Sequence, residues 1–283
     1  MLTLSWFKFR HRLATQLSAF LDADEARAEA AAWLDEGLGK SRAWIASHGS
    51  EPVPFEAQAK VAAWLKRREA GEPWQLILGW TPFRGRRFAV TRDTLIPRPE
   101  SELAVEEAIA LGRRLGAARA VDIGTGSGII AISLALESDW PISAVELSPG
   151  ALAVARSNAH SLGAKVDFHP GSLLDPLPRA FFADGRALVV ANLPYVDPAD
   201  EPSLQRELAY EPAMALFSPG RGLDLNKALL RDARLRGACG LVLELGAGQG
   251  AELTAFATAQ GWEHARIVKD WHDHDRVLVT EAR

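Results

Sequence analysis

The spacing of hydrophobic residues changes along the chain and separates three regions. Residues 1–72 place apolar side chains three or four positions apart, as helices do, whereas residues 73–95 alternate apolar and polar positions, as strands do. From about residue 118, short apolar runs alternate with helical stretches. We therefore predict a small all-helical domain at 1–72, a linking β-hairpin at 73–95 and an α/β domain at 96–283.

Helix-start signals mark the N-terminal region. Asp22 followed by Glu25 resembles a capping box, and Gly37 and Gly39 are suitably placed to end the helix that follows. Pro54 is a suitable residue to open another helix, because its missing N–H has no partner to lose there. The predicted apolar face of that helix consists of Phe55, Ala59, Ala62 and Leu65.

The linking region is predicted to form two strands. Residues 76–80 and 83–90 alternate in polarity around a turn at 80–82, and Gly85 allows a bulge or tight bend. Three arginines make this hairpin basic, namely Arg84, Arg86 and Arg87. They fit either a contact with an acidic or polar partner surface or a charged, solvated sheet edge that resists aggregation.

Strand-like runs in the last region are separated by helices except at the end, where only 270–275 divides two runs. Seven strands are predicted, at 118–123, 142–147, 166–169, 187–192, 240–245, 265–269 and 276–280. This pattern predicts a mostly parallel, doubly wound sheet that ends in an antiparallel hairpin. The layout resembles the Rossmann-like, seven-stranded fold of class I methyltransferases.

The composition is that of a folded cytoplasmic protein. With 283 residues, 48% hydrophobic and 24% charged, the chain can bury one medium and one small core. Its only cysteine, Cys239, excludes a disulfide framework and a thiolate metal site. We interpret His272 and His274 as solvated residues of a turn and expect no metal. Charged residues at 8–12 interrupt the apolar N-terminus, so we expect no signal peptide and no membrane span.

The net charge of −4 is unevenly distributed. Residues 1–100 carry 15 Lys and Arg against 12 Asp and Glu, which leaves 17 against 24 in residues 101–283. Direct binding to nucleic acid normally requires a clustered excess of basic residues. The acidic second part therefore argues against such binding.

A glycine-rich loop follows the first predicted strand of the α/β domain. After Asp122 and Ile123 the loop consists of Gly124, Thr125, Gly126, Ser127 and Gly128. Glycines let the backbone pass close to a ligand, with helix N–H groups directed at it. Glu146 ends the next strand, 24 residues after Asp122, where a carboxylate can accept hydrogen bonds from two ribose hydroxyls. Together these features predict an adenosine-containing cofactor.

A second glycine-rich stretch, at 245–250, also follows a strand. Only 33 residues remain after Gly250, too few for the crossovers that a second nucleotide site needs. We interpret this stretch as a turn between a strand and a helix.

The fourth predicted strand ends in Asn192, Leu193, Pro194 and Tyr195. A dehydrogenase needs a proton donor near the hydride acceptor, and no His or Lys is suitably placed after this strand. An amide nitrogen becomes oriented for methylation when its N–H groups donate to the Asn192 side-chain oxygen and the Leu193 carbonyl. Tyr195 would then wall the pocket. The alternative is a proline turn that only ends a strand.

Seven segments spread over nearly the whole chain carry a family resemblance. They are GEPWQLILG at 71–79, PFRGRRFAV at 82–90, TLIPRPESE at 94–102, VDIGTGSGIIAI at 121–132, NLPYV at 192–196, YEPAMALFSPGRGL at 210–223 and LELGAGQ at 243–249. These segments resemble the bacterial release factor glutamine methyltransferases called HemK or PrmC. The IPRPE segment at 96–100 is the most specific, since it is not general among methyltransferases.

The resemblance implies methyl transfer from S-adenosylmethionine to the side-chain amide nitrogen of the glutamine in the Gly-Gly-Gln loop of peptide chain release factors. It implies that residues 1–72 recognise the substrate. It also implies that the cofactor contacts 124–128, Glu146 and Asn192, and that 192–195 hold the glutamine and carry the catalysis.

Two departures from the family pattern affect this site. Leu193 stands where the family usually has proline, so we expect a slightly looser pocket because φ is no longer locked. The acidic and aromatic pair expected near the adenine falls on Ser172 and Leu173, which are also predicted to contact the cofactor. The change removes a stacking ring.

Three alternatives stay open. The NLPY tetrapeptide is similar to that of ribosomal RNA adenine dimethyltransferases, which also present a planar nitrogen to the methyl group. The ribosomal protein L3 glutamine methyltransferase is a similar relative with the same chemistry. A cofactor-binding scaffold without turnover is the third. The acidic catalytic part and the helical domain favour a protein substrate.

Two neighbouring features each have two interpretations. Glu211 with Pro212 either orders a loop over the substrate or forms a structural turn. Arg98 either stabilises the cofactor carboxylate or pairs with Glu100 or Glu102.

Overall fold

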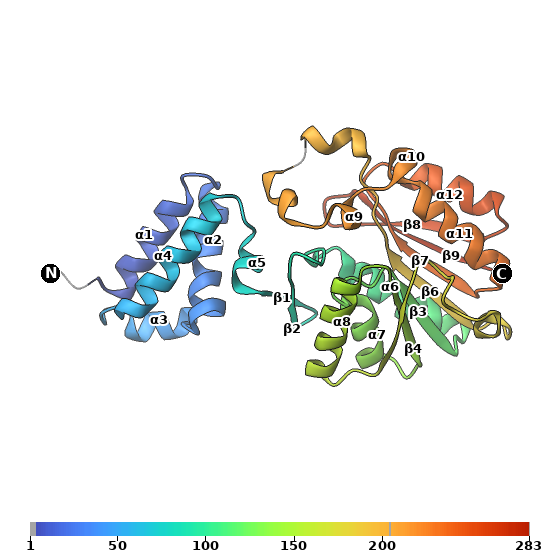
Figure 1. Cartoon of the computed structure of the whole chain (residues 1–283), viewed down its shortest axis with the longest axis horizontal. Helices are drawn as coiled ribbons and strands as arrows, with labels where there is room; N and C mark the ends of the chain where they lie inside the picture. The colour runs from blue at the N-terminus through green and yellow to red at the C-terminus, as the bar shows by residue number, and fades with distance from the viewer. Residues whose placement is uncertain (1–3, 204, 283) are drawn as a thin grey trace. The chain divides into compact units, whose positions relative to one another are not determined.

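The computed structural model describes residues 4–203 and 205–282, and the chain divides into two compact units, Met1–Gly79 and Trp80–Arg283 (Figure 1). The first unit contains only helices. They are α1 (Trp6–Leu17), α2 (Ala23–Ala32), a π-helical turn (Trp33–Gly37), α3 (Arg42–His48), α4 (Phe55–Glu69) and α5 (Trp74–Leu78). The two predicted helix starts are confirmed. The Asp22 side chain accepts hydrogen bonds from the backbone N–H groups of Asp24 and Glu25, and α4 begins directly after Pro54.

The predicted apolar face of α4 is correct only at Leu65. Phe55 is 80% exposed, Ala59 and Ala62 are also exposed, and the helix buries Val61 and Trp64 together with Leu65. These residues bury more apolar area than the two alanines of the predicted face, so the helix turns them toward the core. Trp64 packs edge-on against Trp33 in that core, with ring centroids 5.8 Å apart.

The predicted strand at 76–80 is also wrong, because most of it forms α5. Gly79 has a φ of +81° and ends α5 by donating its N–H to the Gln75 carbonyl. The hairpin therefore begins later, with β1 (Trp80–Phe83) and β2 (Arg86–Ala89). Its turn is at Arg84 and Gly85, whose φ values of +47° and +71° suit a two-residue hairpin loop.

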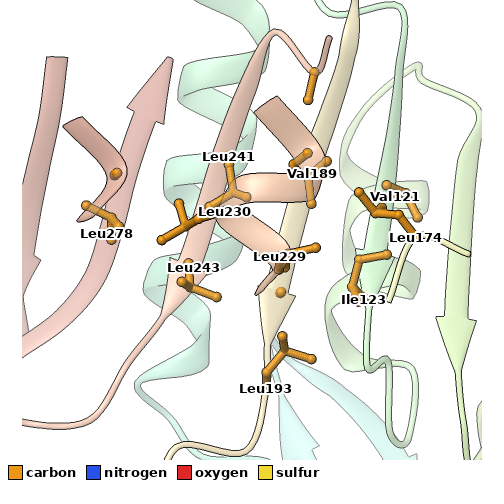
Figure 2. Close-up of a cluster of buried hydrophobic side chains, with 14 of the residues drawn as sticks. Val121, Ile123, Leu174, Val189, Leu193, Leu229, Leu230, Leu241, Leu243 and Leu278 are labelled. Carbon is orange, nitrogen blue, oxygen red and sulfur yellow. The ribbon is translucent and has the colours of Figure 1, made fainter. Parts of the chain in front are cut away.

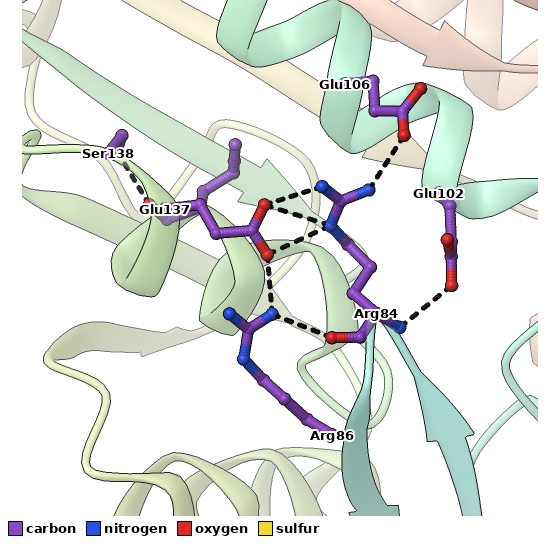
Figure 3. A network of polar contacts seen from close by, with 7 residues as sticks. Arg84, Arg86, Glu102, Glu106, Glu137 and Ser138 are labelled. Atoms are coloured by element: carbon purple, nitrogen blue, oxygen red, sulfur yellow. Dashed lines mark hydrogen bonds and ion pairs between the residues drawn. The ribbon is translucent and has the colours of Figure 1, made fainter.

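Two of the three hairpin arginines, Arg84 and Arg86, are ion-paired to helices of the same unit (Figure 3). Arg84 and Arg86 both bind the Glu137 carboxylate, at 2.7 and 2.6 Å, and the Arg84 backbone N–H donates to Glu102. The Arg84 hydrogen bond is the main reason why the pKa of Glu137 lies below its usual value. Arg84 and Arg86 thus attach the hairpin to its own unit, whereas the Arg87 guanidinium stacks on Trp80, 4.0 Å from the ring centroid.

The second unit is built on a seven-stranded sheet with strand order β5-β4-β3-β6-β7-β9-β8. All seven predicted strands are confirmed, namely β3 (Arg119–Ile123), β4 (Ile142–Glu146), β5 (Val166–Pro170), β6 (Ala187–Asn192), β7 (Gly240–Glu244), β8 (Glu263–Lys269) and β9 (Asp275–Glu281). The strands from β3 to β7 pair in parallel, and β9 runs antiparallel to β7 and β8. This is the class I methyltransferase layout that the sequence predicted.

Helices cover both faces of this sheet (Figure 1). One face packs against α6 (Ser101–Leu115), α7 (Ile129–Glu137) and α8 (Pro149–Leu162). The other packs against α11 (Asp224–Arg236) and α12 (Gly250–Ala259), where Leu229, Leu230 and Leu243 belong to the core shown in Figure 2. Shorter helices join these elements: Arg179–Phe182, Pro198–Ser203, Arg206–Tyr210, α9 (Ala213–Leu216) and α10 (Pro219–Gly222). Across the described part of the chain, no helix has the length and hydrophobicity that a bilayer-spanning segment needs.

Candidate active site

A cavity lies at the carboxyl ends of the parallel strands. The chain leaves β3 toward β4 on one side of the sheet and returns to β6 on the other, and ligands bind doubly wound sheets at such a switch point. The cavity encloses about 1000 Å³ of empty space, part of it open to solvent, and its wall includes the loops after β3, β4 and β6.

The glycine loop and Glu146 form one wall as a hydrogen-bonded unit. The Glu146 carboxylate accepts the backbone N–H of Gly126 at 2.9 Å and that of Ser148 at 2.8 Å, one on each oxygen. Because each carboxylate oxygen can accept two hydrogen bonds, both oxygens keep capacity for a ligand. Gly124 and Gly126 have φ values of +70° and +58°, a conformation that glycine adopts without strain.

Asp122 holds the glycine loop in place through hydrogen bonds. One of its carboxylate oxygens accepts the Thr125 hydroxyl at 2.5 Å and the Ala131 backbone N–H at 3.0 Å. Burial raises the pKa of Asp122 to about 7. Its contacts are all internal, so Asp122 supports the loop that the ligand would contact.

Most of the residues predicted to contact the cofactor line the cavity, but one does not. Thr125 and Ser127 line the cavity together with Gly124, Gly126 and Glu146, but Gly128 is not part of the wall. A Cβ at position 128 would lie 2.8 Å from Ile132 Cδ1 and 3.3 Å from Ala155 Cβ. Gly128 therefore permits close packing between α7 and α8.

The residues proposed for the adenine end, Ser172 and Leu173, do line the cavity. So does Leu147, which is 58% exposed and directly follows Glu146. Leu147 is not among the predicted site residues, although a large apolar residue next to a ligand-binding carboxylate is a usable sequence signal. Two leucines thus supply apolar surface where the expected aromatic ring is absent.

Asn192 and Leu193 lie at the end of β6 and face opposite sides of the sheet. The Asn192 amide nitrogen donates to the Ser101 hydroxyl at 3.2 Å. Leu193 is 5% exposed and belongs to the core under α11 and α12 (Figure 2). Among the described residues, none donates a hydrogen bond to the Leu193 carbonyl, so that oxygen is free to accept one from a ligand.

Pro194 lines the cavity, whereas Tyr195 does not. The Tyr195 ring lies beside Gly246, where a Cβ would be 3.2 Å from Tyr195 Cδ2, and burial raises the pKa of its hydroxyl to about 12. The Tyr195 carbonyl accepts the Gln249 side-chain amide at 2.9 Å. Tyr195 thus anchors the NLPY turn from behind. The stretch at 245–250 forms the predicted strand-to-helix turn, in which the Gly246 N–H donates to Gln249.

Glu211 joins two parts of the cavity wall. Its buried carboxylate accepts the Arg98 guanidinium at 2.5 Å on one oxygen and the Ile96 backbone N–H at 2.8 Å on the other. Glu211 is therefore the partner of Arg98, and neither Glu100 nor Glu102 takes that place. Because Arg98 and Pro212 both line the cavity, this ion pair orders the loop that covers it.

The described residues also include the polar turn after β8. The backbone N–H groups of His272 and His274 donate to Asp270, which also pairs with Arg276 at 3.0 Å. Within the described residues, no cluster of three or more His, Cys, Asp or Glu side chains could hold a metal ion.

The strand order, the loop after β3 and the cavity at the switch point define an S-adenosylmethionine-dependent class I methyltransferase. A model of the PrmC N-terminal domain matches residues 12–79, and a methyltransferase-domain model matches residues 120–210. The chain belongs to the release factor glutamine methyltransferase family.

Relatives of that family match most of the chain. The release factor glutamine methyltransferase of Bordetella pertussis is 42% identical over 247 residues, which cover 86% of this chain and 84% of that protein. The one from Neisseria gonorrhoeae is 38% identical, with 84% and 87% covered, and the one from Cereibacter sphaeroides is 35% identical, with 94% and 95% covered.

Solved structures agree on the fold. The catalytic domain of human Mettl16, in complex with an RNA hairpin, is similar with a TM-score of 0.57 and 18% identity, over 69% of this chain and 75% of that one. The N-terminal domain of human METTL16 in complex with SAH gives a TM-score of 0.52 at 16% identity, over 83% and 86%. At this identity the similarity concerns the fold alone.

Proposed function

We propose that the protein transfers a methyl group from S-adenosylmethionine to the side-chain amide nitrogen of the glutamine in the Gly-Gly-Gln loop of peptide chain release factors. The observation that carries this proposal is the similarity to release factor glutamine methyltransferases over most of both chains. The proposed substrate implies a cytoplasmic location. We further propose that residues 1–72 recognise the release factor and that residues 96–283 form the methyltransferase domain, joined by 73–95.

The residues around the cavity fit the cofactor. The Glu146 carboxylate has acceptor capacity for the ribose hydroxyls, and Gly124 and Gly126 have no side chains to obstruct a ligand. Ser172, Leu173 and Leu147 would surround the adenine. S-adenosylmethionine supplies an electrophilic methyl group on a sulfonium centre.

Asn192 and Leu193 would orient the glutamine amide. Its lone pair is delocalised into its carbonyl, so the nitrogen is a weak nucleophile. When its two N–H groups donate to Asn192 Oδ1 and to the Leu193 carbonyl, the nitrogen is held in position and gains electron density. Pro194 would limit access of water beside it. No general base is needed before the methyl group moves, since the amide loses its proton after transfer.

Incubation with labelled S-adenosylmethionine and one of three acceptors tests the substrate. The acceptors are a release factor, ribosomal protein L3 and ribosomal RNA, and the label is then mapped to a residue or base. We expect label on the Gly-Gly-Gln glutamine. Label on an RNA adenine with none on glutamine would overturn the proposal, and label confined to L3 would redirect it to that relative. A gel-shift measurement with the same RNA tests the expected absence of direct nucleic-acid binding.

A further inference from the structure

At the cavity wall, three polar side chains from distant parts of the sequence form one hydrogen-bonded network. Asn192 ends β6 and Glu244 ends the neighbouring β7, and the register of the two strands sets them directly side by side. Ser101, the first residue of α6, lies between them. The Asn192 amide nitrogen donates to Ser101 Oγ at 3.2 Å, and the Ser101 hydroxyl donates to Glu244 Oε2 at 2.6 Å.

The chemistry of the three groups fixes which of them donates and which accepts in each of these hydrogen bonds. While Glu244 is ionised, its carboxylate only accepts hydrogen bonds, so the single hydroxyl proton of Ser101 goes to Glu244. Ser101 Oγ can then only accept, and only the NH₂ end of the Asn192 amide can face it. The amide oxygen must therefore face the other way, toward the cavity that Asn192 lines. Packing alone would not choose, because the two ends of a carboxamide have nearly the same shape.

We propose that Ser101 and Glu244 are positioning residues that fix the orientation of the Asn192 amide, so that the site presents an acceptor to the N–H groups of the methyl-accepting amide. The orientation of the Asn192 amide follows from the hydrogen bonds alone, whereas its effect on methyl transfer rests on the proposed function. This orientation makes the site select an amide over a carboxylate. An amide donates its N–H groups to Asn192 Oδ1 and the Leu193 carbonyl, whereas a carboxylate in the same place would face these two oxygen acceptors and be repelled.

Burial excludes water from the hydrogen bonds between Asn192, Ser101 and Glu244. Ser101 is 0% exposed and Glu244 is 1% exposed, so neither can exchange its partner for bulk water. The other Glu244 oxygen, Oε1, is buried without a hydrogen-bond partner among the described residues. Arg276 and the neighbouring Asn192 side-chain amide both favour the ionised form of Glu244, whereas Glu100 opposes it. Glu244 in turn disfavours ionisation of Tyr195.

Reversing the direction of these hydrogen bonds by mutation tests the proposal, because a purely structural role of Ser101 and Glu244 does not predict the outcome described here. In Asn192→Asp, an oxygen faces Ser101, whose proton is already committed to Glu244, so the two acceptors repel. Adding Glu244→Gln supplies an NH₂ donor to Ser101 Oγ, and the Ser101 proton can then go to the new carboxylate. The second substitution should therefore restore the network in the opposite direction, with an acceptor oxygen still facing the cavity.

The first experiment observes the Asn192 side-chain NH₂ by nitrogen-15 NMR in the full-length protein without substrate. That resonance is assigned by its loss in Asn192→Asp. We expect it to shift with pH as Glu244 titrates, and to exchange with water at least 10-fold faster in Ser101→Ala and in Glu244→Gln. Ser133→Ala, a buried serine on α7, and Glu281→Gln, a buried carboxylate at the opposite end of the same sheet region, are matched controls. A resonance that is unchanged in both site variants would overturn the proposal.

The second experiment measures methyl transfer to the release factor. Asn192→Asp/Glu244→Gln should be at least 10-fold more active than Asn192→Asp, and Ser101→Ala added to the pair should remove that gain. Equal activity of the single and double variants contradicts the inference, and a gain that survives Ser101→Ala shows simple charge relief and also contradicts it. Circular dichroism and cofactor affinity verify folding. Because the NMR measurement uses no substrate, an inactive wild-type protein would refute the proposed function while the resonance still decides the inference.

Discussion

The Leu193 side chain rests on Gly124, so the turn after β6 and the loop after β3 are in direct contact. A Cβ at position 124 would lie 2.9 Å from Leu193 Cδ2 and 3.8 Å from the Asn192 carbonyl oxygen. Leu193 is also buried in the core under α11. Packing on both sides therefore restrains the leucine that replaces the family's usual proline, which compensates for its unlocked φ.

Gly124→Ala tests this contact. The added methyl group overpacks the loop against Leu193, which typically costs about 1–3 kcal/mol, and a loop shift of that cost would weaken cofactor binding roughly 10-fold. Isothermal titration with S-adenosylmethionine measures it. Gly163→Ala is the matched control, because Gly163 has nearly the same φ, +69°, but no atom within 4 Å of the added Cβ. Adding Leu193→Ala to Gly124→Ala should recover much of the affinity, and failure to recover it contradicts the packing explanation.

Asn192→Ala separates cofactor binding from turnover. The substitution removes the side-chain oxygen that would orient the substrate amide but leaves Glu146 and the glycine loop untouched. We expect cofactor affinity to stay within a factor of a few and turnover to fall by about 100-fold or more, since orientation of the reacting group is lost. Single-turnover methyl transfer with saturating release factor measures the effect. Turnover close to that of the wild type would refute the role of Asn192.

The parts of the fold that depend on local pattern could be predicted from the sequence. The run at 118–123 is mostly apolar with Asp122 as its next-to-last residue, the run at 187–192 is apolar and ends in Asn192, and both strands occur as predicted. The run at 76–80 could not be assigned in this way, because four large apolar residues and one glycine fit a short helix with its end as well as a strand. The left-handed Gly79, which ends α5, decides between the two in the folded protein.

Pairings between distant residues could not be predicted. Arg98 has Glu100 and Glu102 as neighbours in sequence, yet it binds Glu211, 113 residues away. Ser101 and Glu244 are 143 residues apart and become neighbours only when α6 packs across β6 and β7. The sequence therefore predicts which residues end the strands, whereas the partners that orient them depend on tertiary packing.

Glu211→Gln tests the ion pair that orders the cavity wall. The variant can still accept the Ile96 N–H but loses the charge that binds Arg98. We expect the free energy of unfolding to fall by about 1–3 kcal/mol, which urea denaturation measures. We also expect the KM for the release factor to rise, because the loop at Pro212 loses its anchor, and steady-state kinetics measure this effect. Glu252→Gln, which breaks solvent-accessible pairs with Arg221 and Lys227, should change the free energy of unfolding much less, because solvent screens such pairs. Equal effects of the two substitutions would contradict the role of Glu211.

Glu244 should make both stability and activity depend on pH near neutrality. Burial raises the pKa of its carboxyl group from 4.5 to about 7, against the opposing effects of the Ser101 hydrogen bond and Arg276. The folded protein then keeps a proton that the unfolded chain has released, so its stability falls as pH rises from about 4.5 to about 7.

The comparison of wild type with Glu244→Gln isolates this effect. Burial also raises the pKa of Asp122 to about 7, but Asp122 is present in both proteins and cancels in the difference. The free energy of unfolding of the wild type, relative to the variant, should fall by about 3 kcal/mol between pH 4.5 and pH 8. Methyl transfer by the wild type should rise over the same window, because ionised Glu244 holds Asn192 in its accepting orientation. Denaturation and activity curves that run parallel in the two proteins would show that Glu244 does not titrate in this range.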